Sequence, residues 1–188
     1  MHKFGKFVAA ALVALPAAAF ADGLSYNYVE AGYVTGDADG TDFDGFRVKI
    51  SGKVADAFYL FGSYGALETD TSPAVESDTI TAGLGWRHAL GKATDFTAEA
   101  AFVNADVEVS GFGSDDDSGY GLGVGIRHLI TSQFEVGGNV DYVDIFEDDT
   151  TTFTVSGLFH VTPALSAGIS YSTDDDVDAW TFGGRFNF

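Results

Sequence analysis

Two Arg-His pairs are the residues of this sequence that come nearest to a catalytic arrangement. Arg87-His88 lies in the stretch GLGWRHAL, and Arg127-His128 lies in the closely similar GVGIRHLI. A histidine titrates near neutral pH and can serve as a general acid or base. Both stretches alternate as β-strands do, so the arginine and the histidine of each pair would point to opposite faces. Both histidines are followed by two apolar residues, with no nucleophile beside them, and we expect no catalysis here.

Four aspartates in GDADGTDFDG are the candidate metal ligands. Asp37, Asp39, Asp42 and Asp44 are spaced among turn-forming glycines, and clustered carboxylates can bind Ca²⁺. The spacing is not that of an EF-hand loop, because the twelfth position from Asp37 is Val48 rather than a glutamate. Two interpretations remain, a solvated loop that repels itself and a weak, non-specific divalent-cation surface.

The first 21 residues are typical of a secretory signal peptide. The basic MHKFGK is followed by the apolar FVAAALVALPAAAF, and Ala19-Phe20-Ala21 forms an A-x-A cleavage pattern. We therefore expect cleavage after Ala21 and a single mature domain over residues 22–188.

Composition excludes several classes of protein. The chain has no cysteine, so no disulfide framework forms despite the predicted export. It carries 28 acidic and 9 basic residues, and the loss of Lys3 and Lys6 with the signal makes it more acidic still. Such a charge argues against nucleic acid as a partner. Aromatic residues make up 14% of the chain, which opposes disorder.

Alternating segments of strand length cover the rest of the chain, and most of them are close to the ~9–11 residues that cross a bilayer as a tilted strand. Two kinds of connector alternate along the chain. One kind is acidic, such as GDADGTDFD, and the other is short with almost no charge, such as TSQ. Such alternation is expected when every second connector lies on the same side of an up-and-down sheet. An even number of strands also places both termini on the nearly neutral side. The predicted strands are 25–35, 45–54, 58–67, 79–90, 95–108, 119–130, 134–146, 151–161, 165–173 and 179–188.

The two faces of these strands distinguish a membrane barrel from a soluble one. In residues 119–130 one face is Tyr, Leu, Val, Ile, His and Ile, and the other is three glycines, Arg and Leu. The second face is too small and polar to fill a soluble core, whereas a membrane barrel is apolar toward lipid and polar toward its lumen. The sequence thus predicts an all-β fold, an up-and-down antiparallel transmembrane β-barrel of ten strands. Eight strands are the alternative, if VNADVEV or VDYVDIF belongs to a ribbon beyond the membrane.

Charged residues within the strands share the small-residue face. An Arg or Lys that faces lipid at mid-bilayer costs ~2–4 kcal/mol, so we expect these side chains to point inward and to pair. Large aromatic residues fall on the opposite, lipid-facing side, where they would form girdles at the membrane boundary. The predicted lumen charge network is Glu30, Arg47, Lys49, Arg87, Glu99, Arg127, Glu135, Asp141, His160 and Arg185. The predicted aromatic girdle and assembly residues are Trp86, Trp180, Phe182, Phe186 and Phe188.

The sequence resembles the small outer-membrane β-barrel proteins of Gram-negative bacteria, the group with OmpX-like and OmpA-like membrane domains. The resemblance rests on the signal peptide, the opening SYNYVEAGY, the repeated G-x-G-x-R strands and the closing WTFGGRFNF. It implies that the aromatic C-terminus, ending at Phe188, is read by the outer-membrane assembly machinery. It also implies lipid and lipopolysaccharide as neighbours, periplasmic termini and no cofactor.

Three function hypotheses remain open at this level. The leading one is a non-enzymatic outer-membrane protein that contributes to envelope integrity or surface interaction, since the connectors leave little room for an active site. The first alternative is a narrow channel for small solutes, and the second is a lipid-modifying or proteolytic enzyme. A soluble secreted barrel is a further, less favoured interpretation.

Overall fold

The computed structural model describes residues 23–188, so the predicted signal peptide lies outside the described residues. These residues form strands and turns, and they contain no helix that is long and apolar enough to cross a membrane. The strands are β1 (Tyr28–Ala38), β2 (Thr41–Ala55), β3 (Phe58–Thr69), β4 (Val75–Ala89), β5 (Thr94–Val109), β6 (Gly113–Thr131), β7 (Phe134–Ile145), β8 (Asp148–His160), β9 (Leu165–Thr173) and β10 (Val177–Asn187).

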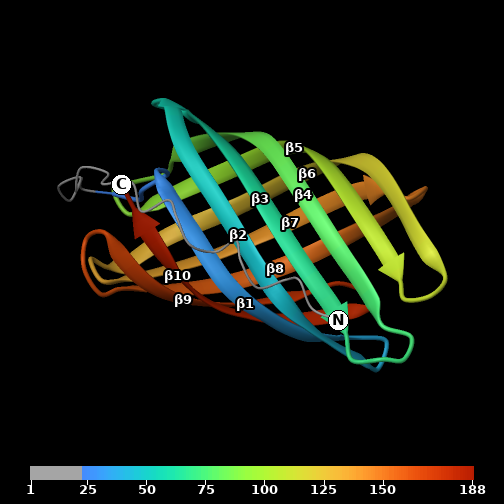
Figure 1. Cartoon of the computed structure of the whole chain (residues 1–188). Helices are drawn as coiled ribbons and strands as arrows, with labels where there is room; N and C mark the ends of the chain where they lie inside the picture. The colour runs from blue at the N-terminus through green and yellow to red at the C-terminus, as the bar shows by residue number, and fades with distance from the viewer. Residues whose placement is uncertain (1–22) are drawn as a thin grey trace.

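The ten strands form a closed antiparallel barrel in which each strand pairs with its neighbours in the sequence (Figure 1). β1 and β10 complete the closure, with Tyr28 opposite Asn187 and Ala38 opposite Val177. Closure leaves no unpaired sheet edge, as a strand protein in a lipid environment requires. The predicted all-β, ten-strand fold is confirmed, and the eight-strand alternative is wrong.

The strands are longer than predicted at one end of the barrel. We call this the acidic end, since the acidic hairpins lie there, and we call the opposite end, with the short turns and Phe188, the termini end. β5 has 16 residues and β6 has 19, so most of SGFGSDDDSG is strand and the turn is only residues 110–112. The segment 36–45 likewise forms the paired tips of β1 and β2 around Asp39-Gly40. The segment VNADVEV therefore forms part of the extended β5–β6 hairpin, but it belongs to β5, which is one of the ten strands of the barrel.

Two of the acidic-end turns have both central residues in the left-handed region. In the β1–β2 turn these are Asp39 and Gly40, with φ of 52° and 81°. In the β7–β8 turn they are Phe146 and Glu147, with φ of 58° and 61°. Two-residue hairpins favour this geometry because it matches the twist of the strands, and Asp-Gly adopts it readily. Phe146 and Glu147 adopt it without glycine, so that turn carries backbone strain.

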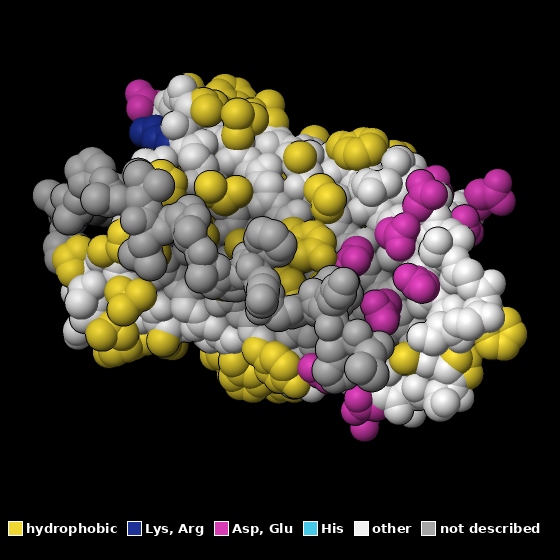
Figure 2. Space-filling model, viewed as in Figure 1, with side chains coloured by type: hydrophobic (Ala, Val, Ile, Leu, Met, Phe, Trp, Pro, Cys, Tyr) yellow, Lys and Arg dark blue, Asp and Glu magenta, His cyan; other side chains and the backbone are white. Residues whose placement is uncertain are grey.

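Outward and inward faces differ as the alternation predicts. Leu122, Val124 and Ile126 of β6 are exposed on the outer wall, while the glycines between them face the lumen. Figure 2 shows hydrophobic side chains over the visible wall and acidic side chains gathered toward one end. The buried residues lie inside the barrel, so the core is the filled part of the lumen. They include Tyr26, Tyr28, Val34, Phe43, Tyr59, Val103, Ala105 and Leu158.

Candidate functional site

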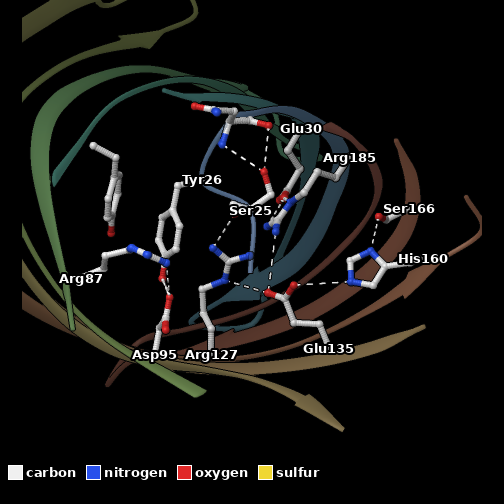
Figure 3. A network of polar contacts seen from close by, with 12 residues as sticks. Ser25, Tyr26, Glu30, Arg87, Asp95, Arg127, Glu135, His160, Ser166 and Arg185 are labelled. Atoms are coloured by element: carbon white, nitrogen blue, oxygen red, sulfur yellow. Dashed lines mark hydrogen bonds and ion pairs between the residues drawn. The ribbon is translucent and has the colours of Figure 1, made fainter. Parts of the chain in front are cut away.

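A short segment ahead of β1 enters the lumen at the termini end. Tyr26 of this segment is only 4% exposed. Its hydroxyl donates to Asp95 Oδ2 at 3.1 Å, and its carbonyl accepts from Ser51 Oγ at 2.8 Å. The carbonyl of Ser25 accepts from Arg127 Nη1 at 2.9 Å, so wall residues hold the segment at two successive positions (Figure 3).

Two ion pairs enclose the Tyr26 ring. Arg87 Nη1 lies 2.9 Å from Asp95 Oδ2, and Arg127 Nε lies 2.7 Å from Glu135 Oε1. The two guanidinium carbons lie 5.2 Å and 4.6 Å from the centroid of the tyrosine ring, within the range of cation–π attraction. The ring is thus held between two cations, each neutralised by its own carboxylate.

Glu135 connects three strands of the wall. Besides Arg127, its carboxylate lies 3.6 Å from His160 Nε2 and 3.8 Å from Arg185 Nη1. His160 Nδ1 is hydrogen-bonded to Ser166 Oγ at 2.7 Å, and Arg185 Nη2 lies 2.7 Å from Glu30. A buried carboxylate is tolerated only with such partners. We call the whole group the lumen plug, and it comprises Ser25, Tyr26, Glu30, Arg87, Asp95, Arg127, Glu135, His160, Ser166 and Arg185.

A cavity of about 500 Å³ lies inside the barrel beyond the plug, toward the acidic end. Arg47, Lys49, Glu99 and Asp141 line it, together with serine and threonine hydroxyls. Lys49 Nζ lies 3.8 Å from Glu99 Oε1, and the Tyr59 hydroxyl donates to the same oxygen at 2.7 Å. A smaller cavity of about 130 Å³ adjoins the plug around Tyr26 and Arg127.

The ten residues of the predicted lumen network fall into two groups. Glu30, Arg87, Arg127, Glu135, His160 and Arg185 meet in the plug, and Arg47, Lys49, Glu99 and Asp141 line the cavity. Sequence reasoning missed Asp95 and Tyr26. Asp95 shares the parity of Glu99 in the same predicted strand, and Tyr26 shares the parity of Glu30, so alternation could have placed both inside.

The two Arg-His pairs are divided by the wall. Each arginine enters the plug, whereas His88 and His128 are exposed on the outside near the termini end. His88 stacks on Trp86 with the ring centroids 5.7 Å apart, and His128 Nδ1 is hydrogen-bonded to Thr94 Oγ1 at 2.8 Å. These contacts are those of side chains that line a surface rather than of an acid–base pair.

The predicted girdle residues lie on the outer wall, with Trp86 near the termini end and Trp180 near the acidic end. Phe182 and Phe186 follow on the same outward face of β10, while the backbone N–H of Phe188 donates to Asn27 O at 3.1 Å. Three tyrosines outside the predicted girdle set lie on the outer wall near Trp180. The hydroxyls of Tyr64, Tyr120 and Tyr171 donate to Asp78, Asp144 and Asp178 at 2.7, 3.2 and 2.6 Å.

Rows of carboxylates run across neighbouring strands on the outside of the acidic end. We call them the acidic rows, and they are Asp44–Glu68–Glu76–Glu108 and Asp78–Asp106–Asp116. Of the four predicted metal ligands, Asp44 belongs to the first row, and Asp37 stands opposite Asp42 in the β1–β2 hairpin. Among residues 23–188 no group of three or more His, Cys, Asp or Glu side chains is arranged to hold a metal ion. Weak cation binding at Asp37, Asp39, Asp42 and Asp44 stays a prediction.

Comparison with known proteins agrees with this architecture. The family model described as outer membrane protein beta-barrel domain matches residues 7–188. The chain belongs to this family. It is therefore an outer-membrane β-barrel protein, and the resemblance noted in the sequence is confirmed.

Solved structures similar to this outer-membrane barrel include several proteins of low sequence identity. The NanC porin is 14% identical with a TM-score of 0.53, over 86% of this chain and 99% of that one. OprG from Pseudomonas aeruginosa is 11% identical with a TM-score of 0.48, over 86% and 94%. Ail of Yersinia pestis is 16% identical with a TM-score of 0.39, over 86% and 97%. The NanC likeness supports the barrel fold alone, and curated protein sequences gave no significant match.

Proposed function

We propose that this protein is a non-enzymatic barrel that reinforces the outer membrane through contacts between its acidic rows and lipopolysaccharide. In this proposal the acidic end faces the outside of the cell, and both termini face the periplasm. Divalent cations lie between the carboxylates of the protein and the phosphates of the neighbouring lipopolysaccharide.

The acidic rows are the observation that supports this proposal. Asp78, Asp106 and Asp116 are direct cross-strand neighbours, and like charges in such positions destabilise a sheet unless counter-ions are present. The rows are on the outer wall rather than at the tips of loops, directly beyond the tyrosines that end the apolar band. A wall of this kind faces lipid headgroups at close range, where hard divalent cations favour oxygen ligands from both sides.

Thermal unfolding in vesicles that contain lipopolysaccharide tests the proposal. Mg²⁺ is expected to raise the unfolding temperature well above that in Na⁺ of equal ionic strength. The variant D78N/D106N/D116N should lose most of this Mg²⁺ effect. The control D39N/D175N/D176N removes the same charge from turns and should keep it. Equal responses of the two variants, or no specific Mg²⁺ effect on the unmodified protein, would contradict the proposal.

A narrow channel is the second candidate, and the cavity of about 500 Å³ is the observation that favours it. The lumen plug opposes it, because Tyr26 and its ion pairs fill the termini end. Single-channel recording decides between the two. We expect no conductance steps from the unmodified protein, and stable steps would make the channel the better conclusion.

We also propose no catalytic role for the exposed histidines. His88 and His128 are engaged with Trp86 and Thr94 on the outer wall, at the end opposite the acidic rows. Replacement of either histidine by glutamine should leave lipid composition unchanged in cells that produce the variant.

A further inference from the structure

Two charged side chains of the large cavity have no ion-pair partner. The ion pairs of residues 23–188 involve neither Arg47 nor Asp141; their cationic members are Lys49, Lys53, Arg87, Arg127, His160 and Arg185. Arg47 is exposed to the lumen, and Asp141 is half-buried with a hydrogen bond from the Asn139 side chain. An unpaired carboxylate that is half-buried is costly, and an exposed guanidinium is open to the cavity, so both groups are available to an outside partner.

The two side chains lie on opposite walls. Arg47 belongs to β2 and Asp141 to β7, and five steps separate these strands in the closed order of ten. The second cation of β2 is Lys49, while Glu99 on β5 stands beside Asp141 with only Gly123 between them in the register. The cavity therefore has a cationic wall on β2 and an anionic wall around β5 and β7.

The charges of the cavity balance. The lining contains three cations, Arg47, Lys49 and Arg185, and three carboxylates, Glu30, Glu99 and Asp141. An anion without a positive group would be repelled by the unpaired Asp141, and a cation without a negative group would be repelled by the unpaired Arg47. A molecule that carries both charges satisfies both walls at once.

We propose that the cavity binds a small zwitterion, with its carboxylate at Arg47 and its ammonium group at Asp141. The volume of about 500 Å³ lies in the range of small-molecule sites. Hydroxyls from Ser63, Thr79, Thr154 and Ser170 line the cavity and supply further hydrogen-bond partners. Since the plug fills the termini end, the ligand enters from the acidic end. The site does not depend on the acidic rows.

Calorimetric titration of the mature protein in detergent micelles tests this site. The probes are linear ω-amino acids of increasing length, namely glycine, 4-aminobutanoate and 6-aminohexanoate, because the distance between their charges can be matched to the cavity. Butanoate and butylamine are the analogues with a single charge. We expect one amino acid to bind saturably, and both analogues to bind at least about tenfold more weakly. This ranking needs no variant, so folding defects do not affect it.

Variants then locate the site. R47Q and D141N should each weaken binding of the preferred amino acid about ten- to a hundredfold, since each removes one charge-assisted contact. K92Q in a turn and D106N on the outer wall alter charge equally and should leave the affinity unchanged. Heat-modifiable gel mobility verifies that each variant is folded. The proposal is overturned if no amino acid binds, if butanoate or butylamine binds as well, or if folded R47Q and D141N retain full affinity.

Discussion

Neutralising Glu135 should be among the most damaging single changes in the barrel. Its carboxylate is 5% exposed and lies 2.7 Å from Arg127, 3.6 Å from His160 and 3.8 Å from Arg185. In E135Q the Arg127 guanidinium remains buried without its counter-ion, and its remaining partners are neutral: the glutamine oxygen, the carbonyl of Ser25 and the Tyr26 ring.

The magnitude follows from the partners that remain. Breaking a buried ion pair by removing one member costs ~3–5 kcal/mol. Glutamine keeps a hydrogen-bond acceptor, and Arg185 keeps its 2.7 Å contact with Glu30, so we expect the lower limit, about 3 kcal/mol. That is a change on the order of a hundredfold in the folding equilibrium constant.

Urea-dependent unfolding in lipid vesicles, followed by tryptophan fluorescence, measures this loss. D56N is the control, because Asp56 makes the exposed ion pair with Lys53 at 3.0 Å. The hydrogen bond from Lys53 lowers the pKa of Asp56, but solvent screens the pair and little stability should be lost. R127M/E135L, which removes both charges, should recover most of the loss. A decrease for E135Q no larger than that for D56N would refute the reasoning and indicate a hydrated plug.

Three further perturbations give independent checks. Y26A removes the ring from the termini end and should produce conductance steps in planar bilayers that the unmodified protein lacks; a silent Y26A barrel would mean that the remaining ion pairs close the lumen alone. Replacing Phe146-Glu147 by Asn-Gly should stabilise the barrel by about 1–2 kcal/mol in urea titrations, because both positions have positive φ. Gln133→Gly, in a turn without positive φ, should give no such gain. G85A should destabilise by about 1–3 kcal/mol, since a Cβ there would overlap a buried tyrosine ring of the lumen.

The alternation of apolar and polar residues predicts the strands of the barrel wall well, but it predicts the ends of those strands poorly. Within the lipid-facing band each outward position must be apolar, so strands such as 119–130 are evident from their period. Beyond that band both faces of a strand meet water. Stretches such as SDDDS therefore show no alternation of apolar and polar residues, although their backbone remains paired in the sheet. The sequence therefore predicts loops where β5 and β6 continue as strands.

The charge network was predicted as a set, but not as pairs. Side-chain parity places Arg127 and Glu135 in the lumen, whereas their contact depends on the register of β6 and β7. The contact of Arg185 with Glu30 depends on closure of the barrel between β1 and β10, and the contact of His160 with Glu135 depends on the register of β7 and β8. Neither register nor closure can be obtained from the period of one strand.

The unequal length of the hairpins determines what an approaching object meets first. β6 has 19 residues, roughly 60 Å of chain at ~3.3 Å per residue, and only ~9–11 residues are needed to cross the membrane. The β5–β6 hairpin thus stands above its neighbours, and its tip is Ser110, Gly111 and Phe112, without a single charge. Phe112 is 83% exposed. An object arriving from solution on that side would touch an uncharged apolar tip before it came within range of the carboxylates below.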